Sequence, residues 1–183
     1  MRIIQFSVFT LVMISTILLN GCSTLSKGEC VEADWYEIGL RDGMNGYKRA
    51  RLDSHREACS EHGIRPDRQA YYLGRDEGLM RYCTPQTALR EGKQNHSYRY
   101  VCPPEVENIF LTAFEIGKNI YQVETDIRRA EREIDKKERE LDKHHDDDKR
   151  RRELRDQIYQ LDRELRILRI ERDQLYELEK PYL

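Results

Sequence analysis

The distances between cysteines and glycines repeat along this chain. In two successive segments one cysteine precedes a glycine by nine residues, and a second cysteine precedes a second glycine by fifteen. The pairs, in chain order, are Cys30 with Gly39, Cys59 with Gly74, Cys83 with Gly92, and Cys102 with Gly117. We therefore predict a duplicated unit, with one copy from residue 30 to about 82 and the other from residue 83 to about 121.

The residues around each glycine indicate how the copies fold. Each glycine has an aromatic or apolar residue three positions earlier, namely Tyr36, Tyr71, Leu89 and Phe114. Positions three and four apart share one helical face, so the residues around each glycine predict a helix that has a gap beside a large side chain. Because a glycine inside a helix costs about 1 kcal/mol relative to alanine, we expect another helix to fill each gap. The predicted packing notches are at Gly39, Gly43, Gly74, Gly78, Gly92 and Gly117.

The N-terminal residues are typical of an exported protein. Arg2 precedes an unbroken run of apolar or small residues that ends at Leu19. Cys22 then follows Leu19-Asn20-Gly21, which resembles the cleavage motif of a bacterial lipoprotein. We interpret residues 1–21 as a signal peptide and Cys22 as the lipidated residue.

The apolar run leaves one alternative, an uncut membrane anchor, because at about 1.5 Å per residue it is just long enough to span a bilayer. The cysteine directly after Gly21 favours lipidation. Residues 22–29 would then form a tether, and Ser23 in place of an aspartate indicates the outer membrane, facing the periplasm.

Four cysteines remain after Cys22, and in an oxidising compartment they are expected to form two disulfides. Equivalent copies favour equivalent bonds, Cys30 with Cys59 and Cys83 with Cys102. A swapped pattern, Cys59 with Cys83 and Cys30 with Cys102, respects the same symmetry and stays open. No two of these cysteines have the close spacing of a zinc site, so we predict no metal and no cofactor there.

The C-terminal third is highly charged but balanced, with 18 Lys and Arg and 19 Asp and Glu in residues 118–180. Apolar residues recur there at alternating intervals of four and three, which is typical of a coiled coil. The first seam is Ile116, Ile120, Val123, Ile127, Ala130, Ile134 and Leu141; the second is Leu154, Ile158, Leu161, Leu165, Leu168 and Leu175. Each seam has one polar position, Lys137 in the first and Arg172 in the second.

The two seams are separated by residues 142–152, which include no apolar residue. We favour an antiparallel hairpin over residues 118–183, since folding back buries both seams within one chain. One continuous rod would need a stutter here and a second chain. His144, His145 and Asp146 to Asp148 could suggest a metal site, but we interpret them as the polar turn of the hairpin.

Enzymatic signatures are absent from the sequence. We find no nucleophile elbow, zinc-protease motif or phosphate-binding glycine loop. Asp42 and Glu77 occupy equivalent positions after Gly39 and Gly74, which favours a repeated structural pairing, with Arg41, Arg75 or Arg81 as candidate partners. A net charge of -2 and the expected lipidation also argue against nucleic-acid binding.

Several segments together resemble a known family. They are DWYEIGLRDGMNG (34 to 46), HREAC (55 to 59), GIRPDRQAYYLGRDEGL (63 to 79), YCTP (82 to 85) and VCPP (101 to 104). The set resembles the proteobacterial lipoprotein family catalogued as domain of unknown function twenty-seven ninety-nine. This resemblance implies a secreted, lipidated helical module and no established activity.

We therefore expect an all-α protein, with a disulfide-stapled duplicated domain over residues 30–117 and a coiled-coil arm over residues 118–183. The expected function is a non-enzymatic, lipid-anchored envelope protein whose arm binds a protein partner or another copy of itself. The alternative is a glycan-binding or peptidoglycan-acting module. In that case Trp35, Tyr71, Tyr72 and Tyr82 would stack on the ligand.

Overall fold

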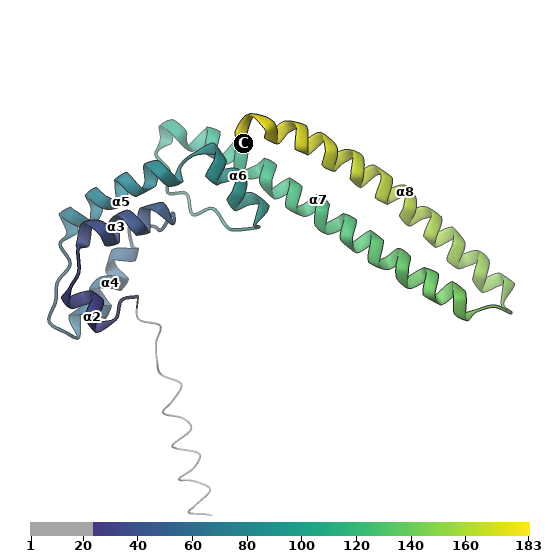
Figure 1. Ribbon diagram of the computed structural model, residues 1–183, viewed down its shortest axis with the longest axis horizontal. Coiled ribbons are helices and arrows are strands. Elements are labelled where there is room, and N and C mark those ends of the chain that lie inside the picture. The colour runs from purple at the N-terminus through teal and green to yellow at the C-terminus, as the bar shows by residue number, and fades with distance from the viewer. Residues whose placement is uncertain (1–23) are drawn as a thin grey trace, which may run out of the picture. The chain divides into compact units, whose positions relative to one another are not determined.

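The computed structural model describes residues 24–183, and over this range the chain folds into helices without any strand (Figure 1). The elements are α2 (Lys27–Val31), α3 (Trp35–Met44), α4 (Arg51–Ser60), α5 (Arg68–Tyr82), α6 (Pro85–Lys93), α7 (Pro104–Lys143), α8 (Asp148–Glu179) and the short 3-10 helix η2 (Lys180–Tyr182). The predicted all-α class is confirmed. The predicted signal peptide and Cys22 lie outside the described residues.

The described chain forms two compact units. Unit 1 comprises residues 24–43 and 47–78, and unit 2 comprises residues 44–46 and 79–183. Each unit has its own core: Tyr71 and Trp35 are among the buried residues of unit 1, and Phe110 and Phe114 are among those of unit 2. Because α7 runs through residue 117 without a break, the second repeat and the arm belong to the same unit.

In unit 1, α3 and α5 cross where their glycines meet. A Cβ added at Gly39 would collide with the Tyr71 carbonyl group and lie 3.0 Å from the Arg75 nitrogen. A Cβ added at Gly74 would collide with the Tyr36 carbonyl group. Each glycine therefore lies against the residue three positions before the other glycine, and the two backbones approach closely only because neither position has a side chain.

Unit 2 repeats this crossing with α6 and α7. A Cβ added at Gly92 would collide with the Phe114 carbonyl group, and one added at Gly117 would collide with that of Leu89. Phe114 and Leu89 occupy the same positions relative to their glycines as Tyr71 and Tyr36 do in unit 1. The predicted duplication is thus a repeated pair of crossed helices, and the notches at Gly39, Gly74, Gly92 and Gly117 are each filled by the partner helix within the same copy. The predicted notches at Gly43 and Gly78 stay predictions.

The disulfides follow the repeat. Cys30 is bonded to Cys59 in unit 1, and Cys83 is bonded to Cys102 in unit 2, with Cα–Cα distances of 5.5 and 5.6 Å. This is the pairing favoured by equal spacing, and the swapped pattern does not occur. Each bond closes a loop within its own copy, which limits the conformations available to the unfolded chain.

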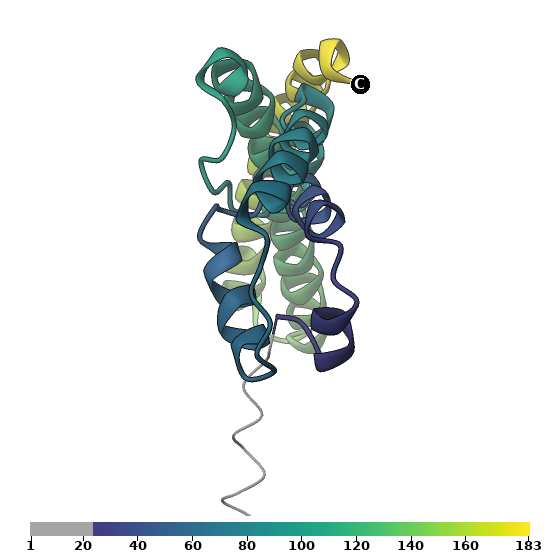
Figure 2. The same ribbon diagram turned by 90° about the vertical axis from the view of Figure 1, so that its left-hand side faces the viewer.

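The arm is an antiparallel hairpin made by the second part of α7 and by α8, which contact each other extensively (Figure 1). Figure 2 shows the two helices in a foreshortened view, with the part of α7 that lies in the arm in green. The buried side chains include Ile120, Val123 and Ile127 from α7 and Leu154, Leu165 and Leu175 from α8. The hairpin prediction is therefore confirmed, and both seams are used within one chain.

The turn lies between Lys143, the last residue of α7, and Asp148, the first of α8. The Asp147 side chain accepts a hydrogen bond of 2.9 Å from the Arg150 backbone N–H and so caps α8. Asp148 in the first turn also interacts favourably with the helix dipole. These acidic residues therefore begin a helix, as the turn interpretation predicts.

Part of the expected tether is folded onto unit 1. Leu25 is 4% exposed and belongs to the unit 1 core. Ser26 and Glu29 form a reciprocal capping box that starts α2. The interpretation of residues 22–29 as a tether is wrong from Leu25 onward, because an apolar residue and a helix cap fix this segment to the domain. Among the described residues, no helix combines the length and apolar character needed to cross a bilayer.

Candidate functional site

A network of buried polar side chains joins four segments of unit 1. Asp42 Oδ2 accepts a hydrogen bond of 2.6 Å from the Tyr71 hydroxyl and lies 2.8 Å from His55 Nε2. On the other side of the ring, His55 Nδ1 lies 2.8 Å from the Thr24 hydroxyl. If Nε2 carries the proton that faces the carboxylate, Nδ1 accepts from Thr24, and every polar group in the series has a partner.

Burial makes this network a structural connection. The side chains of His55 and Asp42 are 3% and 7% exposed. Burial raises the pKa of Tyr71, and its hydrogen bond to Asp42 raises it further, so this hydroxyl keeps its proton. A series of hydroxyl, imidazole and carboxylate is also used by hydrolases. Here the imidazole is enclosed, so a substrate could reach it only after the segments around it had opened.

The pairing of Asp42 has a counterpart across the helix crossing. Glu77 accepts a hydrogen bond from the Tyr36 hydroxyl, just as Asp42 accepts one from Tyr71. In each pair the tyrosine lies three residues before the glycine of its own helix. The carboxylate lies three residues after the glycine of the opposite helix. The sequence indicated a repeated pairing for these carboxylates, and the two tyrosines are partners that it did not name.

Arg75 shows how the same crossing is tied to the loop after α3. Its guanidinium donates hydrogen bonds of 2.7 and 3.0 Å to the Tyr47 carbonyl oxygen. Arg75 is 3% exposed, and burial lowers the pKa of its guanidinium. The arrangement holds the loop in place and leaves this cation unavailable to a ligand.

The aromatic residues proposed for glycan stacking are mostly inaccessible. Tyr71 is 0% exposed, Tyr82 is 4% exposed and Trp35 is 9% exposed. Tyr72 is half-buried, and the Arg49 guanidinium lies 4.2 Å from the centre of its ring. The expectation of a stacking surface is therefore wrong for three of the four residues, because the aromatic positions face the helix partner and fill the core.

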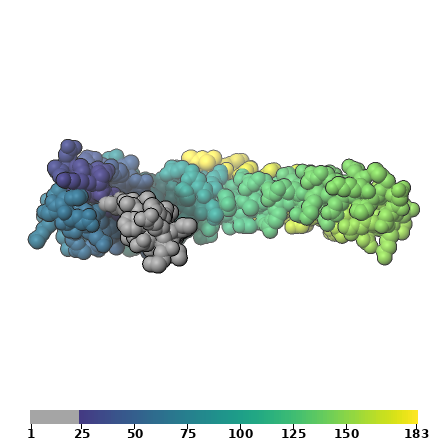
Figure 3. All heavy atoms as spheres, turned by 90° about the horizontal axis from the view of Figure 1, so that it is seen from below, coloured from purple at the N-terminus to yellow at the C-terminus, as the bar shows by residue number. Residues whose placement is uncertain are grey.

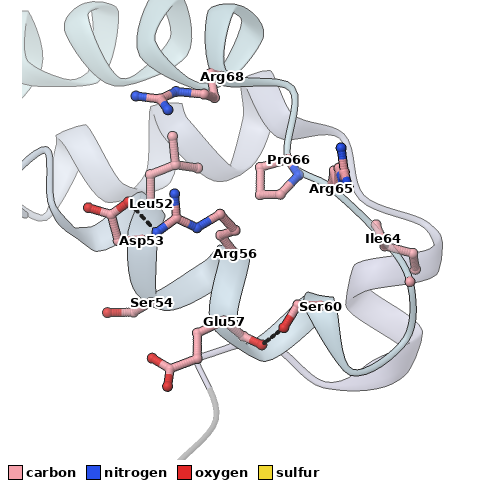
Figure 4. Close-up of a pocket in the computed structure, with 11 residues that line it drawn as sticks. Leu52, Asp53, Ser54, Arg56, Glu57, Ser60, Ile64, Arg65, Pro66 and Arg68 are labelled. Atoms are coloured by element: carbon pink, nitrogen blue, oxygen red, sulfur yellow. Dashed lines mark hydrogen bonds and ion pairs between the residues drawn. The ribbon is translucent and has the colours of Figure 1, made fainter.

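An open groove of about 860 Å³ lies in unit 1 between α4 and the chain that leads into α5 (Figure 4). Leu52, Ile64 and Pro66 supply its apolar lining, and Arg56, Arg65 and Arg68 supply positive charge. Arg56 forms an ion pair of 3.2 Å with Asp53. None of the residues that line the groove is aromatic. No pattern in the sequence indicated this groove. Its lining residues come from a helix and a loop, and together they form no recognisable motif.

The outer face of α8 carries a second apolar stripe, which the seam analysis also missed. Tyr159, Ile167, Ile170 and Leu178 are between 57% and 63% exposed. At about 100° per residue they lie within an arc of about 100°, and the centre of that arc is about 150° from the centre of the buried seam. We call these four residues the outer stripe. The signal in the sequence was the presence of large apolar residues at positions that the heptad pattern leaves to polar ones.

Figure 3 shows one long side of the arm, covered mainly by α7, with the C-terminal part of α8 in yellow at its margin. The flanks of the outer stripe are charged. Arg166 lies beside its N-terminal half and Asp173 beside its C-terminal half, whereas Arg163 lies within its arc and Glu177 at its margin, all exposed. An exposed apolar stripe with charged flanks is typical of a protein-interaction surface.

No group of three or more His, Cys, Asp or Glu side chains in residues 24–183 is placed to hold a metal ion. The two turn histidines, His144 and His145, are exposed. The arrangement of the turn is explained by helix capping.

The described chain is thus an all-α protein in which a disulfide-linked pair of crossed helices occurs twice and ends in a helical hairpin. Residues 34–119 match the family model described as Protein of unknown function (DUF2799). The match confirms the resemblance of this segment to that domain family, and the proteobacterial lipoprotein character stays a prediction. Searches of curated proteins and of solved structures found no match.

Proposed function

We propose that this protein is a lipid-anchored protein of the bacterial envelope that binds a protein partner through its helical arm. Acyl chains on Cys22 would hold it in the outer membrane on the periplasmic side. The two disulfide-linked helix crossings would serve as the folded support of the arm, without enzymatic activity. The four cysteines in disulfides support an oxidising location.

One observation carries the proposal: α7 and α8 bury the seam between them, and the arm still exposes the apolar outer stripe. A hairpin that acted only as a spacer would need one apolar face, which α7 and α8 bury against each other. The four exposed side chains on the opposite face of α8 have no such role within the chain. Their burial against a partner would supply a hydrophobic contribution of the kind that drives protein association.

The test is site-specific crosslinking in living cells. A photoreactive amino acid in place of Arg155 lies beside the outer stripe, whereas one in place of Arg128 lies on α7. We expect irradiation to link a defined protein to the chain carrying the probe at position 155, and much less at position 128. The absence of captured protein at position 155 and at Gln174, on the same face, would contradict an interaction arm.

Point variants suit this arm better than its removal. Truncation before residue 122 would strip unit 2 of core residues such as Val123, Ile127 and Leu165. Substitution of an exposed residue such as Ile170 by glutamate leaves that core intact. Loss of capture in such a variant would then report the surface and not the fold.

The anchor has its own test. Cys22→Ser should release the chain from the membrane fraction into the soluble periplasm if lipidation at Cys22 holds it there. The control is the unchanged chain, fractionated in the same way. Continued membrane retention of the variant would count against a lipid anchor at this residue.

The glycan-binding alternative has less support. Trp35, Tyr71 and Tyr82 are enclosed in the cores, and the groove of unit 1 has no aromatic lining residue. Sugar rings bind proteins chiefly by stacking on aromatic faces and by hydrogen bonds, and the first of these is missing from that groove.

A further inference from the structure

The outer stripe is symmetric about its own centre, and this symmetry says what kind of partner fits it. Tyr159 and Leu178 lie at equal distances along the sequence before and after the point between Leu168 and Arg169. Ile167 and Ile170 lie at equal distances from the same point. The spacing of the large apolar residues in the stripe is therefore the same in either direction along α8.

A surface with this property is self-complementary under a two-fold rotation. If two α8 helices pack antiparallel through their outer stripes, Tyr159 of one copy faces Leu178 of the other, and Ile167 faces Ile170. Two-fold interfaces are built in this way, since each residue contacts a partner that makes the reciprocal contact. All four side chains of each copy are then covered at once.

The charges within the antiparallel overlap permit this orientation. About the point between Leu168 and Arg169, residues 154–168 of one copy face residues 169–183 of the other. The first segment contains three Arg against three Asp and Glu, and the second contains three Lys and Arg against four Asp and Glu. Neither segment therefore carries a large excess of one charge that would oppose the contact.

The charged residues beside the stripe fit this arrangement in detail. Arg166 in the first half and Asp173 in the second lie beside the stripe on one side, whereas Arg163 lies within its arc and Glu177 at its margin. In a two-fold antiparallel pair the same side of each helix meets, so Arg166 comes within about one turn of Asp173 of the other copy. Asp173 and Glu177 now bond the neighbouring Arg172 and Lys180, both on the surface, and such exposed pairs exchange partners at little cost.

From the symmetric stripe and the placement of Arg166 near Asp173 of the other copy, we infer that the partner of the arm is a second copy of this chain. Two hairpins pack antiparallel through the outer faces of their α8 helices and form a four-helix assembly. This inference rests on the proposed function, because it names the occupant of the same surface. It goes further by specifying the contact pairs and the direction of the second chain.

The test uses the full chain, produced with its own N-terminal segment in bacterial cells as two differently tagged copies. One copy carries a photoreactive amino acid at Gln174, and the crosslinked peptides are identified by mass spectrometry. Gln174 and Arg163 are related by the same symmetry point, so the expected crosslink joins position 174 to the peptide around Arg163 of the other copy. A crosslink to the peptide around position 174 of the other copy would indicate a parallel pair and overturn the inference.

Matched variants separate the surface from the fold. Ile167→Glu with Ile170→Glu should lower capture of the second copy about tenfold or more, because it places charges in the centre of the apolar contact. These residues are 63% and 60% exposed, so the helix content of the variant should be unchanged. Ile109→Glu, at an apolar position on α7 that is 49% exposed, is the control and should leave capture intact.

The outcome also distinguishes this inference from the proposed function. Capture of a different protein at Gln174, without the second copy, would overturn self-association and leave the interaction arm standing. Capture of nothing at Gln174 and Arg155 would overturn both. Loss of crosslinking in the Ile109→Glu control to the same extent as in the stripe variant would also overturn the antiparallel contact.

Discussion

The glycines at the two crossings decide how close the helix backbones come. At Gly39, Gly74, Gly92 and Gly117 the space that a Cβ would occupy is already taken by backbone atoms of the opposite helix. Backbone atoms cannot rotate away as the end of a long side chain can. A larger residue at any of these positions would therefore force the two helices apart. The helix-propensity cost of glycine is therefore offset by a contact that no other residue permits.

Gly74→Ala should lower the free energy of unfolding by roughly 1–3 kcal/mol, as overpacking of a filled interior does. The reason is the collision of the new methyl group with the Tyr36 carbonyl group. Urea unfolding followed by circular dichroism would measure the loss. Gly28→Ala in α2 is the matched control: nothing lies within 4 Å of its Cβ position, so it should be neutral or slightly stabilising. Equal stability of the two variants would contradict the crossing.

Tyr98 gives a prediction about pH. Its pKa is raised to about 12, chiefly by burial and also by its bond to Glu107, while the bond donated by the Cys102 backbone N–H acts in the opposite direction. The unfolded chain has the ordinary tyrosine pKa of about 10. The folded state therefore holds this proton more tightly, so the stability that Tyr98 contributes is complete below about pH 10 and is lost as pH rises through about 12.

Tyr98→Phe should make the decline in stability at alkaline pH less steep, even though it removes the hydrogen bonds to Glu107 and from Cys102 at neutral pH. The measurement is the free energy of unfolding between about pH 8 and about pH 11.5, compared with the unchanged chain. Tyr159→Phe, at an exposed position on α8, is the control. An unchanged slope in Tyr98→Phe would show that this proton does not contribute.

At the scale of elements, the arm depends on how its two helices begin and end. α7 extends for 40 residues and α8 for 32, and only four residues lie between them. The turn includes neither glycine nor proline. Its order comes instead from the Asp147 cap and from Arg151, which donates a hydrogen bond of 3.2 Å to the Leu141 carbonyl oxygen.

Asp147→Ala should lower the stability of the arm by about 1 kcal/mol, the usual effect of removing a side-chain helix cap. Thermal unfolding monitored by circular dichroism would detect the change. Asp146→Ala is a close control, since this neighbouring carboxylate is exposed and makes no capping bond in the turn. A larger effect at position 146 than at 147 would contradict the assigned cap.

The same elements show what a sequence can and cannot reveal. The distances between cysteines and glycines recur in two segments, so the duplication was predictable and the observed disulfide pairs were favoured, although the swapped pattern stayed open. The seam spacing is periodic along each helix of the arm, so the hairpin was also predictable. The partner of Asp42 was not, because a carboxylate near an arginine in sequence can bond a tyrosine from another helix in space. Nor could periodicity reveal whether Tyr71 faces solvent or the core. The outer stripe was hidden because its intervals of eight and three residues follow no heptad.

At the scale of the whole molecule, the described part of the chain has two separate hydrophobic cores. The buried residues of unit 1 and those of unit 2 form two clusters with no member in common. Each core has its own disulfide and its own glycine crossing. Sequence repetition alone does not imply this independence, since duplicated segments can also share one core. Here the arm extends the second core, with Val123, Ile127, Leu165 and Leu175 among its members.

Separate cores predict that damage to one unit spares the other. Cys30→Ser with Cys59→Ser removes a bond that spans 29 residues and should destabilise unit 1 by about 3–4 kcal/mol. Hydrogen exchange with mass spectrometry should then show faster exchange in peptides of α3 and α4, while peptides of α7 and α8 keep their protection. The reciprocal variant, Cys83→Ser with Cys102→Ser, should affect α6 and the start of α7 first. A uniform rise in exchange through α8 in the first variant would mean that the two cores unfold together.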